Sequence, residues 1–405
     1  MPRFEPFAGL RYDPEMAPLA EVIAPPYDVV GPAERERLAA RSAYNSIHLE
    51  LPVPDGERGL DRYEHAAALL SSWEHEGVLR RDDAPAFYVY TMRFRGEDGS
   101  ALSTTGVIGA LRLDEAGGGE VLPHERTMPK PKGDRLDLLR ACQANLSPIW
   151  GLSLTSGLAA ACTAATRGVP APVSAADDDG VVHELWPVSD PEAIAAMVAI
   201  VAATPVVIAD GHHRYETATF YQSERRRANG DVAGAYDAVM AFVVELSPAE
   251  LVVQAIHRLV SGLPEELDVL EALEAHVEVL EGPADPAGLP GEMARVGAIG
   301  LVTRRGNYVL RPRPALVEAA EADLDSSRLD VALASLPAHE IVYQHGARAV
   351  VDAVADGTAQ LGFLLRPATV EQIADTAHSG RRMPPKTTFF HPKPRTGLVL
   401  RSVAN

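Results

Sequence analysis

The stretch PVVIADGHHRYETATFY, residues 205–221, constrains the fold more than any other part of this chain. Its opening apolar run, Val206 to Ile208, predicts a short buried strand. Gly211 allows a tight turn with backbone angles that other residues resist, and a helix is predicted to begin at His212. A strand, a glycine turn and a helix start together predict an anion site, because the first helical amides lack internal partners and carry the positive end of the helix dipole.

Four chemically active side chains follow one another closely at this turn, namely Asp210, His212, His213 and Arg214. Such a density of titratable groups indicates a catalytic or binding site. A purely structural alternative is that Asp210 caps the helix, that Gly211 only makes the turn, and that one histidine belongs to the core.

The composition limits the class of protein. With 405 residues, the chain is too long for one simple core, and its net charge of −19 argues against a general nucleic-acid binder. The two cysteines fit no metal motif and no secreted disulfide framework. We find no apolar run of membrane-spanning length and no apolar signal-peptide core, so we expect a cytoplasmic protein that binds no membrane.

The order of predicted helices and strands indicates a mixed α/β fold with three parts. Residues 1–261 are expected to form the catalytic core and residues 262–375 a second α/β region. Residues 376–405 contain no Asp or Glu but six Lys and Arg, and they are rich in proline. We expect them to form a basic, extended arm that packs back on the core, because Phe389 and Phe390 need burial.

A second unusual stretch, HERTMPKPKGDR, precedes a predicted helix. It is dense in the residue types that catalyse reactions and bind anions. The candidates that we take from it are His124, Glu125, Arg126, Lys132 and Arg135.

Three smaller segments carry plainer expectations. Residues 44–52 alternate like a half-buried strand. Asp28 is expected at a turn before a helix, and either a cap by Asp28 or Pro32 at the first helical position explains the start of that helix. The acidic run Asp177 to Asp179 is expected to be a solvated loop, since no calcium-ligand spacing follows it.

The motifs resemble two related groups of proteins. ADGHHRYETA is similar to the phosphate-binding turn of the ParB and sulfiredoxin superfamily, through Gly211 and Arg214 and, one place late, Ala218. PPYDVV, FYVY, HERTMPKPKGDR, ADGHHRYETA and MPPKTTFFHPK, in this order, resemble a bacterial family of conserved proteins catalogued as domain of unknown function ten-fifteen. This second resemblance covers essentially the whole chain.

The resemblance implies a ParB/sulfiredoxin-like core and a kinase or other phosphotransferase activity. Free-serine kinases of that superfamily are similar in the DGHHR turn and phosphorylate L-serine with a nucleotide or pyrophosphate. By this resemblance, Gly211 to Arg214 would cradle the phosphates, Glu125 would be the general base, and Mg²⁺ with ATP, ADP or pyrophosphate would be the cofactors. ParB relatives bind CTP and DNA, but the charge of this chain and the lack of a helix-turn-helix argue against DNA.

Phosphoryl transfer requires cations around the phosphate oxygens, a metal, and a base on the nucleophile. His212 and His213 are candidates to donate to the transferring group, and Asp210 is the candidate magnesium ligand. The candidate phosphate-binding cations are Arg126, Lys132, Arg135, Arg214, Lys386 and Lys393. Two alternatives stay open, namely a metal-dependent phosphohydrolase and a nucleotide-binding switch or scaffold without catalysis.

Overall fold

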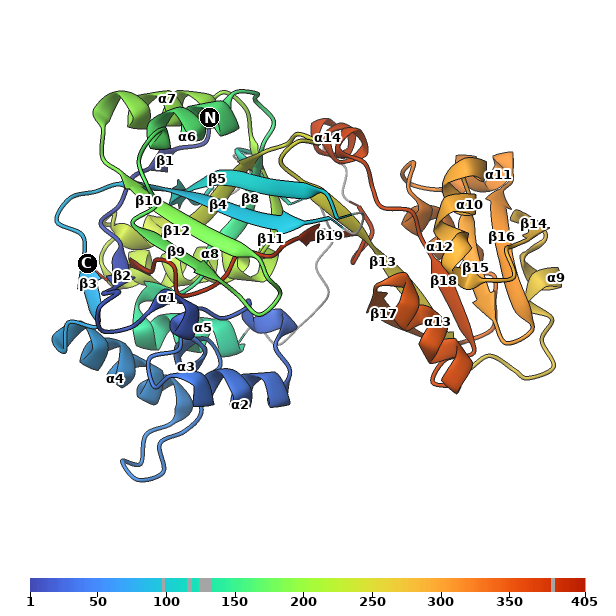
Figure 1. The fold of residues 1–405 in the computed structure, drawn as a ribbon, viewed down its shortest axis with the longest axis horizontal. Helices are drawn as coiled ribbons and strands as arrows, with labels where there is room; N and C mark the ends of the chain where they lie inside the picture. Colours follow the sequence, from blue (N-terminus) through green and yellow to red (C-terminus); the bar gives the residue numbers. More distant parts are fainter. Residues whose placement is uncertain (97–98, 115–118, 124–132, 380–382, 405) are drawn as a thin grey trace. The chain divides into compact units, whose positions relative to one another are not determined.

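The chain folds into two units, each built around its own β-sheet (Figure 1). The computed structural model describes residues 1–404 with the exception of 97–98, 115–118, 124–132 and 380–382. The fold is therefore mixed α/β with two sheets, as the sequence predicted.

Of the described residues, the first unit takes in 1–123, 133–251 and 392–404, and the second takes in 252–391. The domain boundaries that we expected from the sequence, at residues 262 and 376, stay predictions.

The first unit contains a nine-stranded sheet in the order β6-β11-β8-β12-β5-β4-β10-β9, with β1 beside β5. The β6–β11 and β8–β12 pairs are parallel, and the other pairs are antiparallel. The strands are β1 (Phe4–Glu5), β4 (Phe87–Arg95), β5 (Ala101–Arg112), β6 (Val121–Pro123), β8 (Ile149–Ser153), β9 (Val173–Ala176), β10 (Val182–Val188), β11 (Val206–Asp210) and β12 (Ala238–Glu245). Two small ladders join β2 (Leu10–Tyr12) to β3 (Leu79–Arg81) and β7 (Ala144–Asn145) to β20 (Arg401–Ser402).

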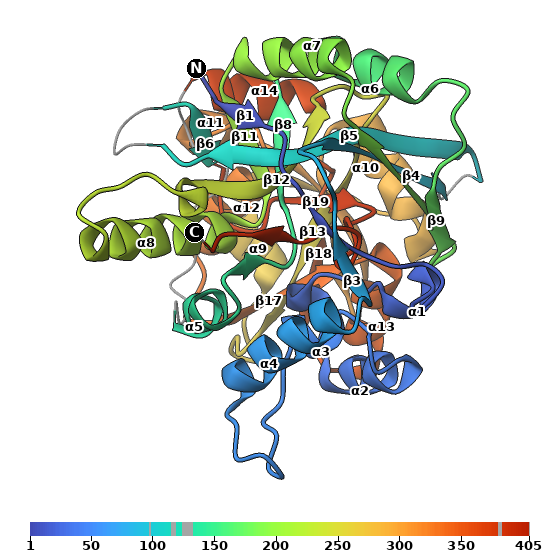
Figure 2. The same cartoon turned by 90° about the vertical axis from the view of Figure 1, so that its left-hand side faces the viewer.

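Helices cover the sheet of the first unit because its strands alternate their side chains between two buried faces. Val206 and Ile208 of β11 join one core cluster, to which α6 contributes Leu158 and α7 contributes Met197, whereas the fully buried Val207 points to the opposite face. Figure 2 shows α6 and α7 side by side over this sheet. The bounds of these two helices are Leu158–Thr166 and Pro191–Ala202.

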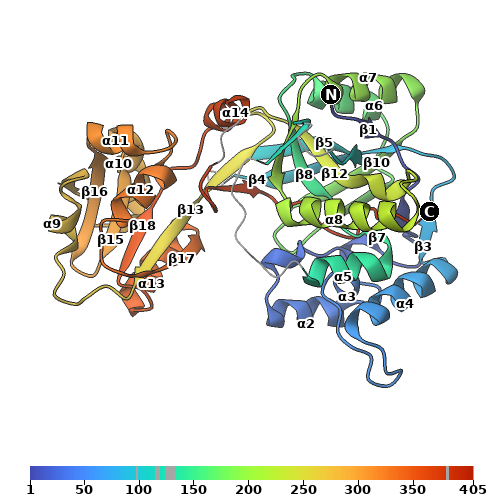
Figure 3. The same ribbon diagram turned by 180° about the vertical axis from the view of Figure 1, so that it is seen from behind.

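The first unit contains further helices besides α6 and α7. They are α1 (Leu19–Val22), η1 (Tyr27–Val29), α2 (Pro32–Arg41), α3 (Ile47–Glu50), α4 (Arg62–His75), α5 (Gly133–Cys142), α8 (His212–Ala228) and η2 (Ala235–Asp237). Helices α5 and α8 pack against each other, as Figure 3 shows, and Leu139 and Tyr221 meet between them. Their apolar contact fixes α8 beside the segment that precedes β8.

The strand expected over residues 44–52 is wrong, because Ile47–Glu50 form the one-turn helix α3. A helix this short shows no 3.6-residue repeat, and the apolar residues Ile47, Leu49 and Leu51 are spaced two apart, as they would be on one face of a strand.

The last residues of the chain lie against the N-terminal segments of the first unit. Thr396 pairs with Ala24 and Leu400 pairs with Leu10 in isolated β-bridges. Leu398, Val399 and Leu400 are almost fully buried, and burial of a large apolar side chain stabilises a fold by roughly 1.5–3 kcal/mol. The four residues before Pro392 belong to the second unit, where they form the strand β19.

The second unit is a sheet between two layers of helices. Its strand order is β14-β16-β15-β18-β13-β17, with β19 beside β13. Adjacent residues such as Leu301 and Val302 join different core clusters, so α9, α11 and α12 cover one face and α10 and α13 the other. The elements are β13 (Val252–Ser261), α9 (Val269–Leu273), β14 (Val277–Glu281), η3 (Pro286–Gly288), α10 (Leu289–Val296), β15 (Ile299–Thr303), β16 (Gly306–Pro312), α11 (Pro314–Ala319), α12 (Asp325–Leu333), β17 (Glu340–His345), α13 (Ala347–Asp356), β18 (Leu361–Leu364), α14 (Val370–His378) and β19 (Thr388–His391).

Among the helices of the described residues, none combines the length and the apolar character that a membrane span requires.

Candidate functional site

The turn between β11 and α8 has the geometry that its sequence predicted. Gly211 adopts φ 88°, and a Cβ at this position would lie 3.0 Å from Nε of Arg214 and 3.1 Å from Cα of Ile149. Both the left-handed backbone and the lack of space therefore require glycine. The N-cap residue Gly211 makes no side-chain cap bond, and the positive end of the α8 dipole suits an anion.

Two cations and two carboxylates meet beside this turn. The ammonium of Lys393 lies 3.0 Å from a carboxylate oxygen of Asp28 and 3.0 Å from one of Asp210. The other oxygen of Asp210 accepts a hydrogen bond of 2.9 Å from Nη2 of Arg214. The side chains of Lys393 and Arg214 are only 12% and 13% exposed, so these ion pairs are shielded from solvent.

Both terminal nitrogens of Arg214 are held, Nη2 by Asp210 and Nη1 by the turn before β8. Its Nη1 donates to Oγ of Ser147 at 3.1 Å and to the carbonyl oxygen of Pro148. Its Nε is buried and has no hydrogen-bond partner in the described part of the chain. The guanidinium is thus oriented by the turn before β8, and it keeps a donor that a ligand oxygen can accept.

A small cavity of about 50 Å³ lies next to Arg214 and is lined by Tyr27, Glu50 and Arg135, among others. The guanidinium of Arg135 stacks over the ring of Tyr27, 4.3 Å from its centroid, and its Nη1 lies 3.3 Å from Oε2 of Glu50. Oε1 of Glu50 is buried and has no partner among the described residues. This cavity therefore presents one cation and one carboxylate oxygen to a small polar molecule.

Opposing charges set the protonation of the cluster. Burial alone would raise the pKa of Asp28, but the charges of Lys393 and Arg214 outweigh it and hold the pKa below its usual value. Burial alone would lower the pKa of Lys393, but Asp210 and Asp28 raise it above the usual value. Burial raises the pKa of Tyr27, which keeps its hydroxyl protonated. At neutral pH, Asp28 and Lys393 are therefore charged and Tyr27 is neutral.

The structure brings Asp210, Gly211, Arg214, Arg135 and Lys393 together in the first unit. His212 and His213 stand in the first turn of α8, where both are half-buried.

The other candidates are not placed at this cluster. His124, Glu125, Arg126 and Lys132 lie outside the described residues. Lys386 belongs to the second unit, and its position relative to Arg214 stays a prediction.

Two acidic residues of the site were missed or misread from the sequence. Asp28 does not cap α2, whose N-cap is Gly31 without a side-chain bond, because its carboxylate binds Lys393 instead. Glu50 is 2% exposed, and the signal that could have found it is an acid set between the apolar residues Leu49 and Leu51.

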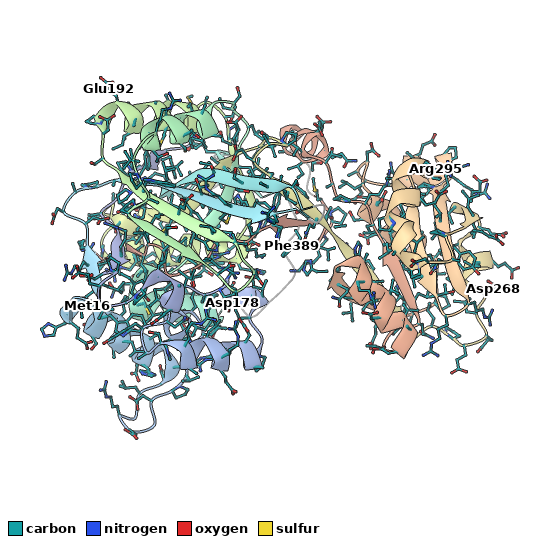
Figure 4. All side chains as sticks on the ribbon, in the orientation of Figure 1. Met16, Asp178, Glu192, Asp268, Arg295 and Phe389 are labelled. Carbon is teal, nitrogen blue, oxygen red and sulfur yellow. The ribbon has the colours of Figure 1, made fainter. Side chains whose placement is uncertain are left out.

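The acidic run Asp177 to Asp179 is not simply a solvated loop. Asp177 accepts from Nε of Arg395 at 2.7 Å, and Asp179 accepts from Nη2 of Arg395 at 2.6 Å. Arg395 itself is 9% exposed, so this loop anchors the C-terminal arm near Lys393. Asp178, labelled in Figure 4, pairs with Arg37 at the surface.

The described residues contain no group of three or more His, Cys, Asp or Glu side chains that could hold a metal ion. Asp28 and Asp210 offer two carboxylates, a donor set that suits a magnesium ion whose remaining ligands are water and phosphate oxygens. The transition-metal site of the phosphohydrolase alternative depends on His124, which lies outside the described residues.

The sequence matches the family model described as "Protein of unknown function (DUF1015)" over residues 4–332. A search among curated proteins found no significant match.

Among solved structures, the chain is similar to three proteins at low TM-scores. A free serine kinase in complex with AMP gives a TM-score of 0.37 at 15% identity, covering 67% of this chain and 83% of that one. A conserved hypothetical protein from Pyrococcus furiosus gives 0.37 at 16% identity, covering 69% and 90%. C-terminally truncated SbnI from Staphylococcus aureus gives 0.38 at 12% identity, covering 71% and 85%. These likenesses are distant.

Proposed function

The chain belongs to the DUF1015 family, as its motifs indicated, and we propose that its first unit is a small-molecule phosphotransferase with a ParB/sulfiredoxin-like core. The acceptor proposed is a free amino acid, L-serine first, and the donor is ATP, ADP or pyrophosphate.

The observation that carries this proposal is the cluster at the start of α8. Arg214 and Lys393 place two cations beside the start of α8, and Gly211 lets the guanidinium of Arg214 approach the backbone closely. Catalysis of phosphoryl transfer consists mainly of positioning and of stabilising charge on the phosphate oxygens. Two oriented cations and a helix start supply both.

Asp28 and Asp210 are the proposed ligands of Mg²⁺, which would neutralise donor phosphate oxygens when bound. Both carboxylates face Lys393, so their charges already meet at one point. The low pKa of Asp28 favours this role over that of a general base, because an efficient base has a pKa near the working pH.

The cavity beside Arg214 is the proposed acceptor site. A free amino acid is a zwitterion, and the cavity offers Arg135 for its carboxylate and Oε1 of Glu50 for its ammonium. The choice of serine comes from the resemblance of the DGHHR turn to free-serine kinases. Glu125 remains the proposed general base for the acceptor hydroxyl.

The experiment incubates the full chain with Mg²⁺, L-serine and one donor at a time, either ATP, ADP or pyrophosphate. Phosphorus NMR follows the products. The expected result is a new phosphomonoester signal that requires both L-serine and one donor. Arg214→Ala should remove the signal, whereas Arg227→Ala, at the exposed end of the same helix, should retain it. Donor hydrolysis that does not depend on any amino acid would contradict the proposal.

A further inference from the structure

A cavity of about 390 Å³ lies within the second unit. Its lining comes from β16, from the start of α12, from the segment after β18 and from the start of α14. The volume falls in the range of small-molecule sites, which is about 300–1,000 Å³. Arg311, Arg328 and Arg366 line it, in a protein whose net charge is −19.

One buried carboxylate orients two of these arginines. Asp325, whose side chain is 3% exposed, accepts from Nε of Arg366 at 2.9 Å and from Nη2 of the same residue at 2.6 Å. Nη1 of Arg328 lies 3.5 Å from the same carboxylate. Two guanidiniums, of which that of Arg366 is 32% exposed, thus share one buried carboxylate, and a further anion at this point would contact both of them.

The second partner of Arg328 is poorly held. Nη2 of Arg328 donates to Asp323, but the Asp323 side chain is 80% exposed. Arg328 is only 8% exposed, and its Nε is buried without a partner among the described residues. An exposed carboxylate on a buried guanidinium is easily replaced by a ligand oxygen, because little packing holds it in place.

We propose that this cavity of the second unit binds a small organic anion through carboxylate or phosphate oxygens. The anion displaces Asp323 from Arg328 and lies at the start of α12, where the N-cap residue Leu324 makes no side-chain cap bond. Arg311 at the rim, 49% exposed, and Gln372 are the side chains that contact the rest of the molecule. This inference does not depend on the function proposed for the first unit.

The test is hydrogen–deuterium exchange of the full chain with citrate, with glycerol 3-phosphate and with glycerol. Slower exchange in residues 323–328 and 365–369 is expected with the anions and not with glycerol. Protection by citrate alone identifies a carboxylate site, and protection by glycerol 3-phosphate alone identifies a phosphate site. Lack of protection in both segments with both anions would overturn the proposal.

Matched variants locate the site, with affinities measured by calorimetry. Arg311→Gln should weaken binding about tenfold, the effect of losing one charge-assisted hydrogen bond. Arg295→Gln removes the same charge from an exposed pair of the same unit at a residue that does not line the cavity (Arg295 is labelled in Figure 4), and this variant should bind like the unaltered chain. If both variants weaken anion binding equally, the anion is held by general charge attraction, and the proposed site is refuted.

Arg214→Gln, in the first unit, should leave the protection of residues 323–328 intact. Its loss in this variant would show that the anion acts through the other site, and the proposal would fail.

Discussion

The ammonium of Lys393 lies 3.0 Å from a carboxylate oxygen of Asp210, although 183 residues separate the two in the chain. The same ammonium lies 3.0 Å from Asp28, 365 residues away. Three distant segments therefore meet at one charge cluster, and the C-terminal arm supplies its central cation. The arm is consequently part of the candidate site and not an appendage to it.

Lys393→Met should weaken binding of the phosphate donor at least tenfold, as expected when a charge-assisted contact is lost and two carboxylates are left facing each other. Lys393→Arg should recover part of the affinity, because it keeps the charge but changes the shape of the donor group. Calorimetry with ADP measures both. Unchanged affinity of Lys393→Met would remove this residue from the donor site.

Arg214→Ala should cost about 1.5–3 kcal/mol of donor binding, the usual range for a hydrogen bond to a charged group. Arg214→Lys should recover little, since Ser147 and Pro148 hold a planar fork that an ammonium cannot reproduce. Arg227→Ala controls for the loss of one charge from α8, at an exposed position. The role of Arg214 is excluded if all three variants bind ADP equally.

Glu125→Gln should reduce turnover by roughly 10²-fold while donor affinity stays nearly constant, because a general base acts on the acceptor and not on the donor. Asp28→Asn should instead reduce donor affinity and its dependence on Mg²⁺, since Asp28 is the proposed metal ligand. Steady-state kinetics over a range of Mg²⁺ concentrations separates the two. Normal turnover of Glu125→Gln would transfer the role of base to another residue.

Local signals were sufficient to predict the backbone at the centre of the candidate site. The apolar run of β11, the glycine at 211 and the helix start at His212 all follow from the preferences of neighbouring residues, and each is present in the structure. Arg214 and Asp210 were found for the same reason, since they lie four residues apart on one turn.

Contacts between distant segments could not be predicted in this way. Asp28 was expected at a turn before a helix that either Asp28 or Pro32 starts, and its contact to Lys393 was missed because Lys393 lies at the other end of the chain. The run Asp177 to Asp179 was taken for a solvated loop because Arg395 is equally remote. Short stretches of sequence show which residues are charged, but only the fold determines which charged residues are buried together.

A buried histidine of the second unit makes stability depend on pH. The backbone N–H of Leu365 donates to Nδ1 of His257 at 3.1 Å, so this nitrogen must carry a lone pair and the ring is neutral. Burial, followed by the charges of Arg258 and His345, lowers the pKa of His257 to about 4. The unfolded chain takes up the proton near pH 6.5, so stability is full above that value and falls as the pH drops towards 4.

The expected loss between pH 6.5 and pH 4 is about 3 kcal/mol, measured by urea unfolding at a series of pH values. His257→Asn removes the titrating group and should flatten this part of the profile. His276→Asn, at a half-buried position of the same unit, is the matched control for the loss of one histidine. A slope that persists in His257→Asn would assign the acid sensitivity to other groups.

Arg395 should be the most important ion-pair partner of the arm for stability. Its Nε binds Asp177, which also accepts from Nε2 of His183 at 2.8 Å, while Nδ1 of His183 is 2.7 Å from the hydroxyl of Tyr90. Burial would raise the pKa of Asp177, but the hydrogen bond from His183 and the charge of Arg395 hold it well below its usual value. Arg395→Ala leaves this carboxylate buried without its cation.

Removal of one partner of a buried pair costs about 3–5 kcal/mol, whereas an exposed pair contributes about 0–1 kcal/mol. Arg395→Ala should therefore lower the free energy of unfolding by several kcal/mol, whereas Arg37→Ala, which loses the exposed contact to Asp178 in the same loop, should change it little. Arg395→Ala should also weaken donor binding, because Lys393 lies two residues away on the same arm. Equal and small effects of the two variants in urea unfolding would show that the acidic loop does not anchor the arm.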